Sequence, residues 1–276
     1  RHVTVETPAG DRARLSFFRF LSRDDRHVSL VSAAVTPLSG DVHVQFDIYL
    51  DGDVRNADAN YDEKFWTIED NTVQDDYTYL AARTLKTGYL LGAAQSVAVK
   101  LNDQVLPAYK EIVSTKDKNG YLLKADITKD DTLTIDKFAA VYTSRDLPEK
   151  DISKTAIGRA RQAKETGYEA LFAKHRDAMA RKWDKLDVEI LGDDLAQQGI
   201  RYNIYQLFST YYGYDPRLNI GPKGFSGEKY GGVTYWDTEG FCLPFYLYQD
   251  ADIALNLLLY RYNQLDKAKE NAAKLG

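Results

Sequence analysis

The 276-residue sequence contains a single cysteine, Cys242, so an intrachain disulfide is excluded. A chain without disulfides is typical of a reducing compartment, and we therefore expect a cytoplasmic protein. No apolar run approaches the roughly 18 residues that a transmembrane helix needs, so a membrane-spanning protein is not expected. The chain begins at Arg1 rather than at a methionine, so the usual test for a signal peptide does not apply.

Basic residues are not in excess, because 36 Lys and Arg stand against 41 Asp and Glu, for a formal charge of −5. This balance argues against nucleic acid or an anionic membrane as a partner. The four histidines and one cysteine show no metal-ligand spacing, so no metal site is predicted. Aromatic residues, by contrast, make up 12% of the chain. Most of them fit well-packed cores, but pyranose rings also stack on aromatic side chains, so sugar binding is a second interpretation.

The first half of the chain alternates as half-buried β-strands do. Residues 42–50 place an apolar side chain at every even position, and shorter alternations lie at 15–17, 97–101 and 133–135. We therefore predict an antiparallel β-sandwich over residues 1–147. The turn signals between its strands are residues 8–10, 39–41, 51–53 and the pair Asn119-Gly120.

Residues 148–190 lack this alternation and are rich in Ala, Lys, Arg and Glu, which predicts a helical linker. Gly167 is the expected break between its two helices. An apolar stripe from Ile200 to Tyr211 predicts the next helix. Asp193 or Asp194 can cap its start and Gly213 can close its end.

A further helix is predicted from about Trp236 to Tyr248. Its apolar residues occur almost all round, so burial on every side is expected, with a kink at Pro244. Two more helices are predicted, from Asp250 or Asp252 and from about Leu265. Alternating buried and half-exposed helices indicate the start of an α/α toroid over residues 191–276.

A glycine-rich loop precedes that buried helix. Its glycines are residues 221, 224, 227, 231 and 232. The phosphate-binding P-loop pattern fails here. Counted from Gly227, the second glycine of that pattern is Gly232, but Val233 follows it where the pattern requires lysine. We interpret the segment as a long loop whose glycines adopt unusual backbone angles. Long ordered loops on a helical scaffold commonly carry binding sites.

Trp236 and Asp237, at the end of this loop, allow two interpretations. An indole beside a carboxylate can hold a sugar, since the ring offers an apolar platform and the carboxylate accepts hydroxyl hydrogen bonds. Alternatively, Asp237 or Thr238 caps the helix and Trp236 packs in the core. Asp237 and Glu239 are not expected to form a catalytic pair, because residues two apart on a helix point about 200° away from each other.

Several long motifs resemble one known family. Residues 193–213, 217–247 and 256–276 closely resemble the maltose phosphorylases of glycoside hydrolase family 65, and 217–247 includes the motif YWDTE at 235–239. The segments 50–66 and 144–151 resemble the same family's N-terminal domain.

The resemblance implies a large β-sandwich, a helical linker, a barrel of six helix pairs and a small C-terminal sheet domain. The implied reaction is cleavage of an α-linked glucose disaccharide by inorganic phosphate, with inversion, to β-glucose 1-phosphate and glucose. Phosphate replaces the activated water of an inverting hydrolase, so one general acid suffices. The resemblance also implies a homodimer, with phosphate as co-substrate and neither a metal nor an organic cofactor.

The resemblance further implies that Trp236 and Asp237 hold the transferred sugar, with Tyr235 and Glu239 as possible support. The family's general acid is a glutamate beyond the position that matches Gly276. We therefore expect no catalytic residue in this chain, and we expect the chain to be a fragment that is inactive alone.

Three other functions remain open. Another phosphorylase of the family could act on trehalose, kojibiose or nigerose. A non-catalytic carbohydrate-binding protein would also explain the many aromatic residues and the lack of an acid. A hydrolase on the same scaffold would carry a base carboxylate later in the protein.

Overall fold

The computed structural model describes residues 1–276 except 56–62, 108–109, 223 and 225–232. The chain divides into two compact units, of which the first contains Arg1–Val54 and Lys64–Met179 and the second contains Ala180–Gly276. Each is described by itself, and the domain boundaries expected at residues 147 and 190 remain predictions. Within the described residues, no helix is long and apolar enough to cross a bilayer.

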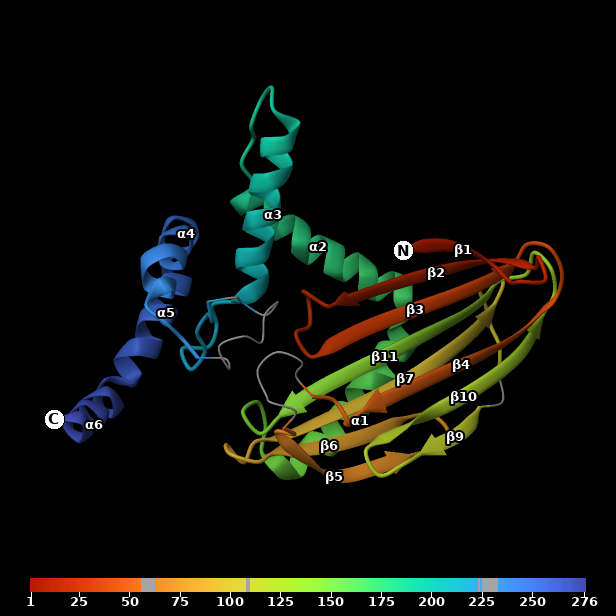
Figure 1. Cartoon of the computed structure of the whole chain (residues 1–276), viewed down its shortest axis with the longest axis horizontal. Coiled ribbons are helices and arrows are strands. Elements are labelled where there is room, and N and C mark those ends of the chain that lie inside the picture. The colour runs from red at the N-terminus through yellow and green to blue at the C-terminus, as the bar shows by residue number, and fades with distance from the viewer. Residues whose placement is uncertain (56–62, 108–109, 223, 225–232) are drawn as a thin grey trace. The chain divides into compact units, whose positions relative to one another are not determined.

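The first unit contains two antiparallel sheets (Figure 1). The larger sheet has the order β1-β2-β3-β11-β7-β6-β5, with β8 paired to β7, and the smaller has the order β4-β10-β9. This confirms the prediction of antiparallel β-structure followed by helices. The strands are β1 (His2–Glu6), β2 (Arg12–Leu21), β3 (Val28–Pro37), β4 (Val42–Asp51), β5 (Trp66–Val73), β6 (Thr78–Thr84), β7 (Leu90–Leu101), β8 (Gln104–Val105), β9 (Glu111–Ser114), β10 (Lys118–Ile127) and β11 (Leu133–Thr143).

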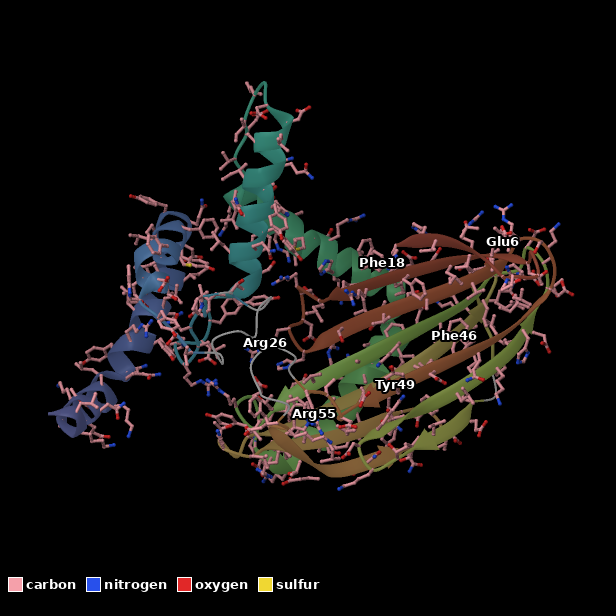
Figure 2. The ribbon with its side chains drawn as sticks, viewed as in Figure 1. Glu6, Phe18, Arg26, Phe46, Tyr49 and Arg55 are labelled. Carbon is pink, nitrogen blue, oxygen red and sulfur yellow. The ribbon has the colours of Figure 1, made fainter. Side chains whose placement is uncertain are left out.

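A hydrophobic core fills the space between the sheets. The even positions of β4 supply Phe46 and Ile48, of which Phe46 is seen in Figure 2. They pack with Val97 and Val99 of β7 and with Leu123 of β10. Side chains alternate across a strand, so one face of each strand enters this core while the other faces away from it.

The opposite face of the larger sheet is covered by helix α1 (Glu149–Thr166) and the start of helix α2 (Tyr168–Leu186). Fully buried alanines such as Ala156 and Ala160 let α1 approach the sheet closely. Phe18 of β2, which is labelled in Figure 2, packs edge-on against Phe172 of α2, with ring centroids 5.1 Å apart. Gly167 separates the helices with φ of +81°, which confirms the predicted break.

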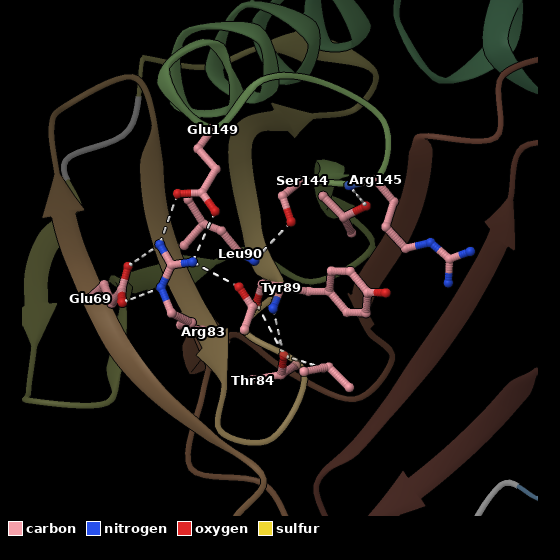
Figure 3. A network of polar contacts seen from close by, with 11 residues as sticks. Glu69, Arg83, Thr84, Tyr89, Leu90, Ser144, Arg145 and Glu149 are labelled. Atoms are coloured by element: carbon pink, nitrogen blue, oxygen red, sulfur yellow. Dashed lines mark hydrogen bonds and ion pairs between the residues drawn. The ribbon is translucent and has the colours of Figure 1, made fainter. Parts of the chain in front are cut away.

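An arginine ties the start of α1 to the sheet (Figure 3). Arg83 of β6 donates to both carboxylate oxygens of Glu149, at 2.9 and 3.0 Å, and to both of Glu69 on β5. These hydrogen bonds lower the pKa of the Glu149 carboxyl below its ordinary value. The planar guanidinium fork thereby joins the neighbouring strands β5 and β6 to the start of α1, which lies 66 positions after Arg83.

The predicted turn at Asn119-Gly120 is wrong, because both residues lie inside β10. A Cβ at Gly120 would sit 2.0 Å from the Ile48 carbonyl oxygen, so glycine permits the close approach of β4. Asn119 is fully buried and its side-chain amide donates to the Tyr79 carbonyl at 2.7 Å. The pair therefore serves close packing rather than chain reversal.

Helix α3 (Asp194–Thr210) is the first predicted helix of the second unit. The Asp193 carboxylate accepts from the Ala196 amide at 2.9 Å, which confirms the predicted cap. The expected end at Gly213 is wrong, since the helix stops at Thr210. Gly213 has φ of +83°, and a Cβ there would lie 2.4 Å from Ile253, so glycine is needed for packing instead.

The helix predicted from Trp236 to Tyr248 is two segments, the π-helical turn η2 (Thr238–Cys242) and helix α4 (Leu243–Gln249). Pro244 lies in the first turn of α4, directly after η2, so the predicted kink falls where the helix changes from π to α. Burial on every side was wrong, since Tyr246 is buried but Tyr248 is 87% exposed. Helices α5 (Ala251–Asn263), capped by Asp250, and α6 (Leu265–Leu275) follow as predicted.

Candidate functional site

The segment 233–239 connects the loop to η2, and a buried hydroxyl fixes its end. Thr238 is 2% exposed, and its hydroxyl donates to the Ile220 carbonyl at 2.7 Å. The π-helical turn follows directly, and π-helical turns are rare elements found frequently at functional sites. Gly221 and Gly224 of the loop are described, the latter with φ of +58°, whereas Gly227, Gly231 and Gly232 lie outside the described residues.

Trp236 presents its indole outward. Trp236 is 68% exposed, so the structure does not place it in the core, contrary to the second interpretation. The ring lies over Gly240, where an added Cβ would be 3.1 Å from indole Cζ3, and its centroid is 5.7 Å from that of Phe241. Both contacts leave much of the ring free to receive an apolar surface.

Asp237 follows Trp236 in the sequence, and its carboxylate is not engaged within the protein. It is partly buried and makes no side-chain cap, contrary to the alternative that it closes the helix start. Its carboxylate has no hydrogen-bond or ion-pair partner among the residues that the structure describes. Burial is the main reason why the pKa of the Cys242 thiol is raised, and the negative charge of Asp237 adds to this effect.

Glu239, by contrast, is fully engaged. Arg261 of α5 donates from Nε to Oε1 at 2.9 Å and from Nη2 to Oε2 at 3.1 Å. The same guanidinium donates to the Thr234 hydroxyl at 3.2 Å and to the Tyr235 carbonyl. The two carboxylates of this segment therefore differ, since Glu239 is held within the protein while Asp237 can accept hydrogen bonds from a ligand.

Arg261 is the residue that sequence reasoning missed. It lies 22 residues after Glu239, in the last turn of another helix, and carries no motif of its own. A basic residue there is also expected for an ordinary reason, because cations stabilise helix C-termini. Its contacts to the segment emerge only when η2 and α5 are packed together.

The arrangement of Trp236 and Asp237 suits a polyhydroxylated ring, with an exposed apolar platform beside a carboxylate acceptor. Their contact with substrate remains a prediction, as does the supporting role of Tyr235 and Glu239. Within the described part of the chain, no group of three His, Cys, Asp or Glu residues is placed to hold a metal ion.

The chain matches known proteins along its whole length. The model of the glycosyl hydrolase family 65 N-terminal domain matches residues 1–182, and that of the family's central catalytic domain matches residues 201–276. Maltose phosphorylase of Bacillus subtilis (strain 168) is 41% identical over 268 residues, covering 95% of this chain and 34% of the relative. A kojibiose phosphorylase of Halothermothrix orenii is 31% identical over 283 residues, covering 100% of the chain and 36% of the relative.

A solved structure shares the fold. It is a chain from the human microbiome, assigned provisionally as a kojibiose phosphorylase, with a TM-score of 0.88 and 24% identity. The match covers 100% of this chain and 35% of that one. The chain thus spans about a third of the length of the proteins it matches.

Proposed function

Because the chain belongs to glycosyl hydrolase family 65, we propose that the whole protein is an inverting disaccharide phosphorylase. The reaction converts maltose and inorganic phosphate into β-glucose 1-phosphate and glucose. The observation that carries this proposal is the identity of 41% to a maltose phosphorylase, against 31% to a kojibiose phosphorylase.

In this proposal Trp236 and Asp237 hold the glucose unit that is transferred. The exposed indole stacks on the apolar face of the ring, and the Asp237 carboxylate accepts hydrogen bonds from its hydroxyls. Charge-assisted hydrogen bonds of this kind are about twice as strong as neutral ones. Tyr235 and Glu239 support the pair, Tyr235 through its backbone carbonyl and Glu239 through its ion pair with Arg261.

The chemical step needs groups beyond these. A phosphate oxygen forms a bond to the anomeric carbon as the bond from that carbon to the leaving glucose oxygen breaks. A general acid gives its proton to the leaving oxygen, so charge and atoms balance. We assign neither the acid nor the phosphate site to residues of this chain.

The architecture proposed for the whole protein follows the same family. Residues 1–147 form the β-sandwich domain, 148–190 the helical linker, and 191–276 the first part of an α/α barrel of six helix pairs. We propose a cytoplasmic homodimer that uses phosphate as co-substrate and needs no metal or organic cofactor.

A phosphorolysis panel tests the proposal. The whole protein is incubated with phosphate and, separately, with maltose, trehalose, kojibiose or nigerose, and glucose 1-phosphate is measured. Release from maltose, with a β-anomeric product by NMR, is expected. If glucose 1-phosphate is released only from another disaccharide, that disaccharide rather than maltose is the substrate. Glucose formed without any need for phosphate would indicate a hydrolase, and binding without turnover would indicate a carbohydrate-binding protein.

A further inference from the structure

Arg261 makes more contacts with the candidate site than a simple ion pair would. Its guanidinium contacts three residues, the Thr234 hydroxyl, the Tyr235 carbonyl and both carboxylate oxygens of Glu239. These partners lie on both sides of Trp236 and Asp237 in the sequence. One side chain on α5 thereby contacts residues on both sides of Trp236 and Asp237.

These two residues have few other restraints. Trp236 is 68% exposed, and Asp237 has no hydrogen-bond partner among the residues described. Two further contacts lie nearby: the Thr238 hydroxyl donates to the Ile220 carbonyl, and the hydroxyls of Thr234 and Tyr260 lie 3.5 Å apart. Without Arg261, the described side-chain hydrogen bonds from residues 234–239 to α5 would be reduced to this long contact with Tyr260.

The geometry requires arginine in particular. A guanidinium presents five donors in a rigid planar fork, whereas a lysine amine is a point charge on a flexible stem. Lysine at 261 could pair with Glu239 but could not meet Thr234 and Tyr235 at the same time. The Arg261–Glu239 pair is also well shielded, with side chains 35% and 24% exposed, so it persists better than a fully exposed surface pair.

We propose that Arg261 is a positioning residue, which holds the segment 234–239 so that Trp236 and Asp237 are set for the sugar before it arrives. This inference rests on the proposed function, since it assigns Arg261 to the same site. Such preorganisation reduces the ordering cost of binding and aligns the sugar for attack. Arg261 touches neither substrate nor phosphate in this proposal.

The test compares Arg261→Gln and Arg261→Lys with a matched control, Arg201→Gln. Arg201 also makes two hydrogen bonds to a carboxylate, that of Asp187, but this pair lies away from the segment 234–239 in sequence and shares none of its contacts. The variants are made in the whole protein. Steady-state kinetics are measured for maltose and for phosphate, and amide exchange of the peptide covering 234–239 is followed without sugar.

We expect Arg261→Gln to raise the KM for maltose and to lower kcat/KM for maltose about tenfold or more, with the KM for phosphate nearly unchanged. Amide exchange in 234–239 should accelerate while exchange in the β-sandwich does not. Arg261→Lys should recover part of the loss, and Arg201→Gln should resemble the parent protein. A general loss of stability would instead raise exchange throughout the second unit.

The outcomes separate this inference from the function on which it rests. If Arg261→Gln matches Arg201→Gln in kinetics and exchange while Asp237→Asn loses activity, the positioning role is wrong and the sugar site stands. If the parent protein cleaves no disaccharide of the panel, the proposed function is wrong. The exchange measurement still decides the role of Arg261 in that case, because it needs no turnover.

Discussion

Two carboxylates only two positions apart have different surroundings in this protein. Both oxygens of Glu239 accept hydrogen bonds from Arg261, so its capacity is used inside the protein. Asp237 makes no helix cap and has no partner among the described residues. A partly exposed carboxylate of this kind keeps its accepting capacity for water or for a ligand. The hydroxyl groups of a sugar could use that capacity, which makes Asp237 the residue to vary first.

Replacing Asp237 with asparagine in the whole protein keeps the shape but removes the charge. Each charge-assisted bond to a sugar hydroxyl contributes on the order of 1.5–3 kcal/mol. We therefore expect kcat/KM for maltose to fall roughly tenfold to a hundredfold or more, with the thermal midpoint close to that of the parent. Initial rates of glucose 1-phosphate formation measure the effect.

A matched control for this substitution is Asp266→Asn, at an exposed aspartate in the first turn of α6. It changes the same charge far along the chain and should leave the kinetics unaltered. Unchanged kinetics for Asp237→Asn would remove Asp237 from the sugar site.

At the scale of elements, the contact of β4 with β10 depends on the absence of a side chain at Gly120. The Ile48 carbonyl oxygen would lie 2.0 Å from a Cβ at that position. Both strands belong to the smaller sheet and pair over ten residues, so a displacement would propagate along the pair. Overpacking of this kind typically costs about 1–3 kcal/mol.

We expect Gly120→Ala to lower the free energy of unfolding of the 276-residue chain by roughly that amount, on the order of 1–3 kcal/mol. Denaturant unfolding followed by far-UV circular dichroism measures it. Gly40→Ala is the matched control, because no atom lies within 4 Å of a Cβ built there. Equal midpoints for the two variants would show that β4 shifts without cost.

The sequence predicts elements well where the signal is local. The alternation over residues 42–50 identifies β4, and Asp193 and Asp250 cap the helices that follow them. The turn predicted at Asn119-Gly120 was wrong because a pair that suits a turn also suits a strand that another backbone approaches closely. That requirement comes from β4, about seventy positions earlier in the chain, and no local pattern carries it.

The candidate site divides in the same way. Trp236 and Asp237 are found from their motif and from the chemistry of an indole beside a carboxylate. The exposure of Trp236 and the missing cap at Asp237 depend on η2, a π-helical turn that apolar periodicity does not distinguish from an α-helix. Arg261 was missed because its four hydrogen bonds to the segment exist only once α5 has packed.

For the molecule as a whole, phosphorolysis requires three things in one place. These are a held sugar, a protonated group on the leaving oxygen and a fixed phosphate. In our proposal, Trp236 and Asp237 provide the first. Loss of general acid assistance alone typically costs 10²–10⁴ in rate, and an unfixed phosphate forfeits the entropic gain of a preassembled attack.

We therefore expect the purified 276-residue chain to form no measurable glucose 1-phosphate from maltose and phosphate, whereas a longer protein that contains it should do so. A coupled assay of the product, run at high protein concentration, makes the comparison. Glu239 is poorly suited to act as a general acid, since Arg261 donates hydrogen bonds to both of its oxygens. Turnover that disappears with Asp237→Asn in the same preparation could not come from a contaminating enzyme. It would show that an acid within these residues performs the chemistry.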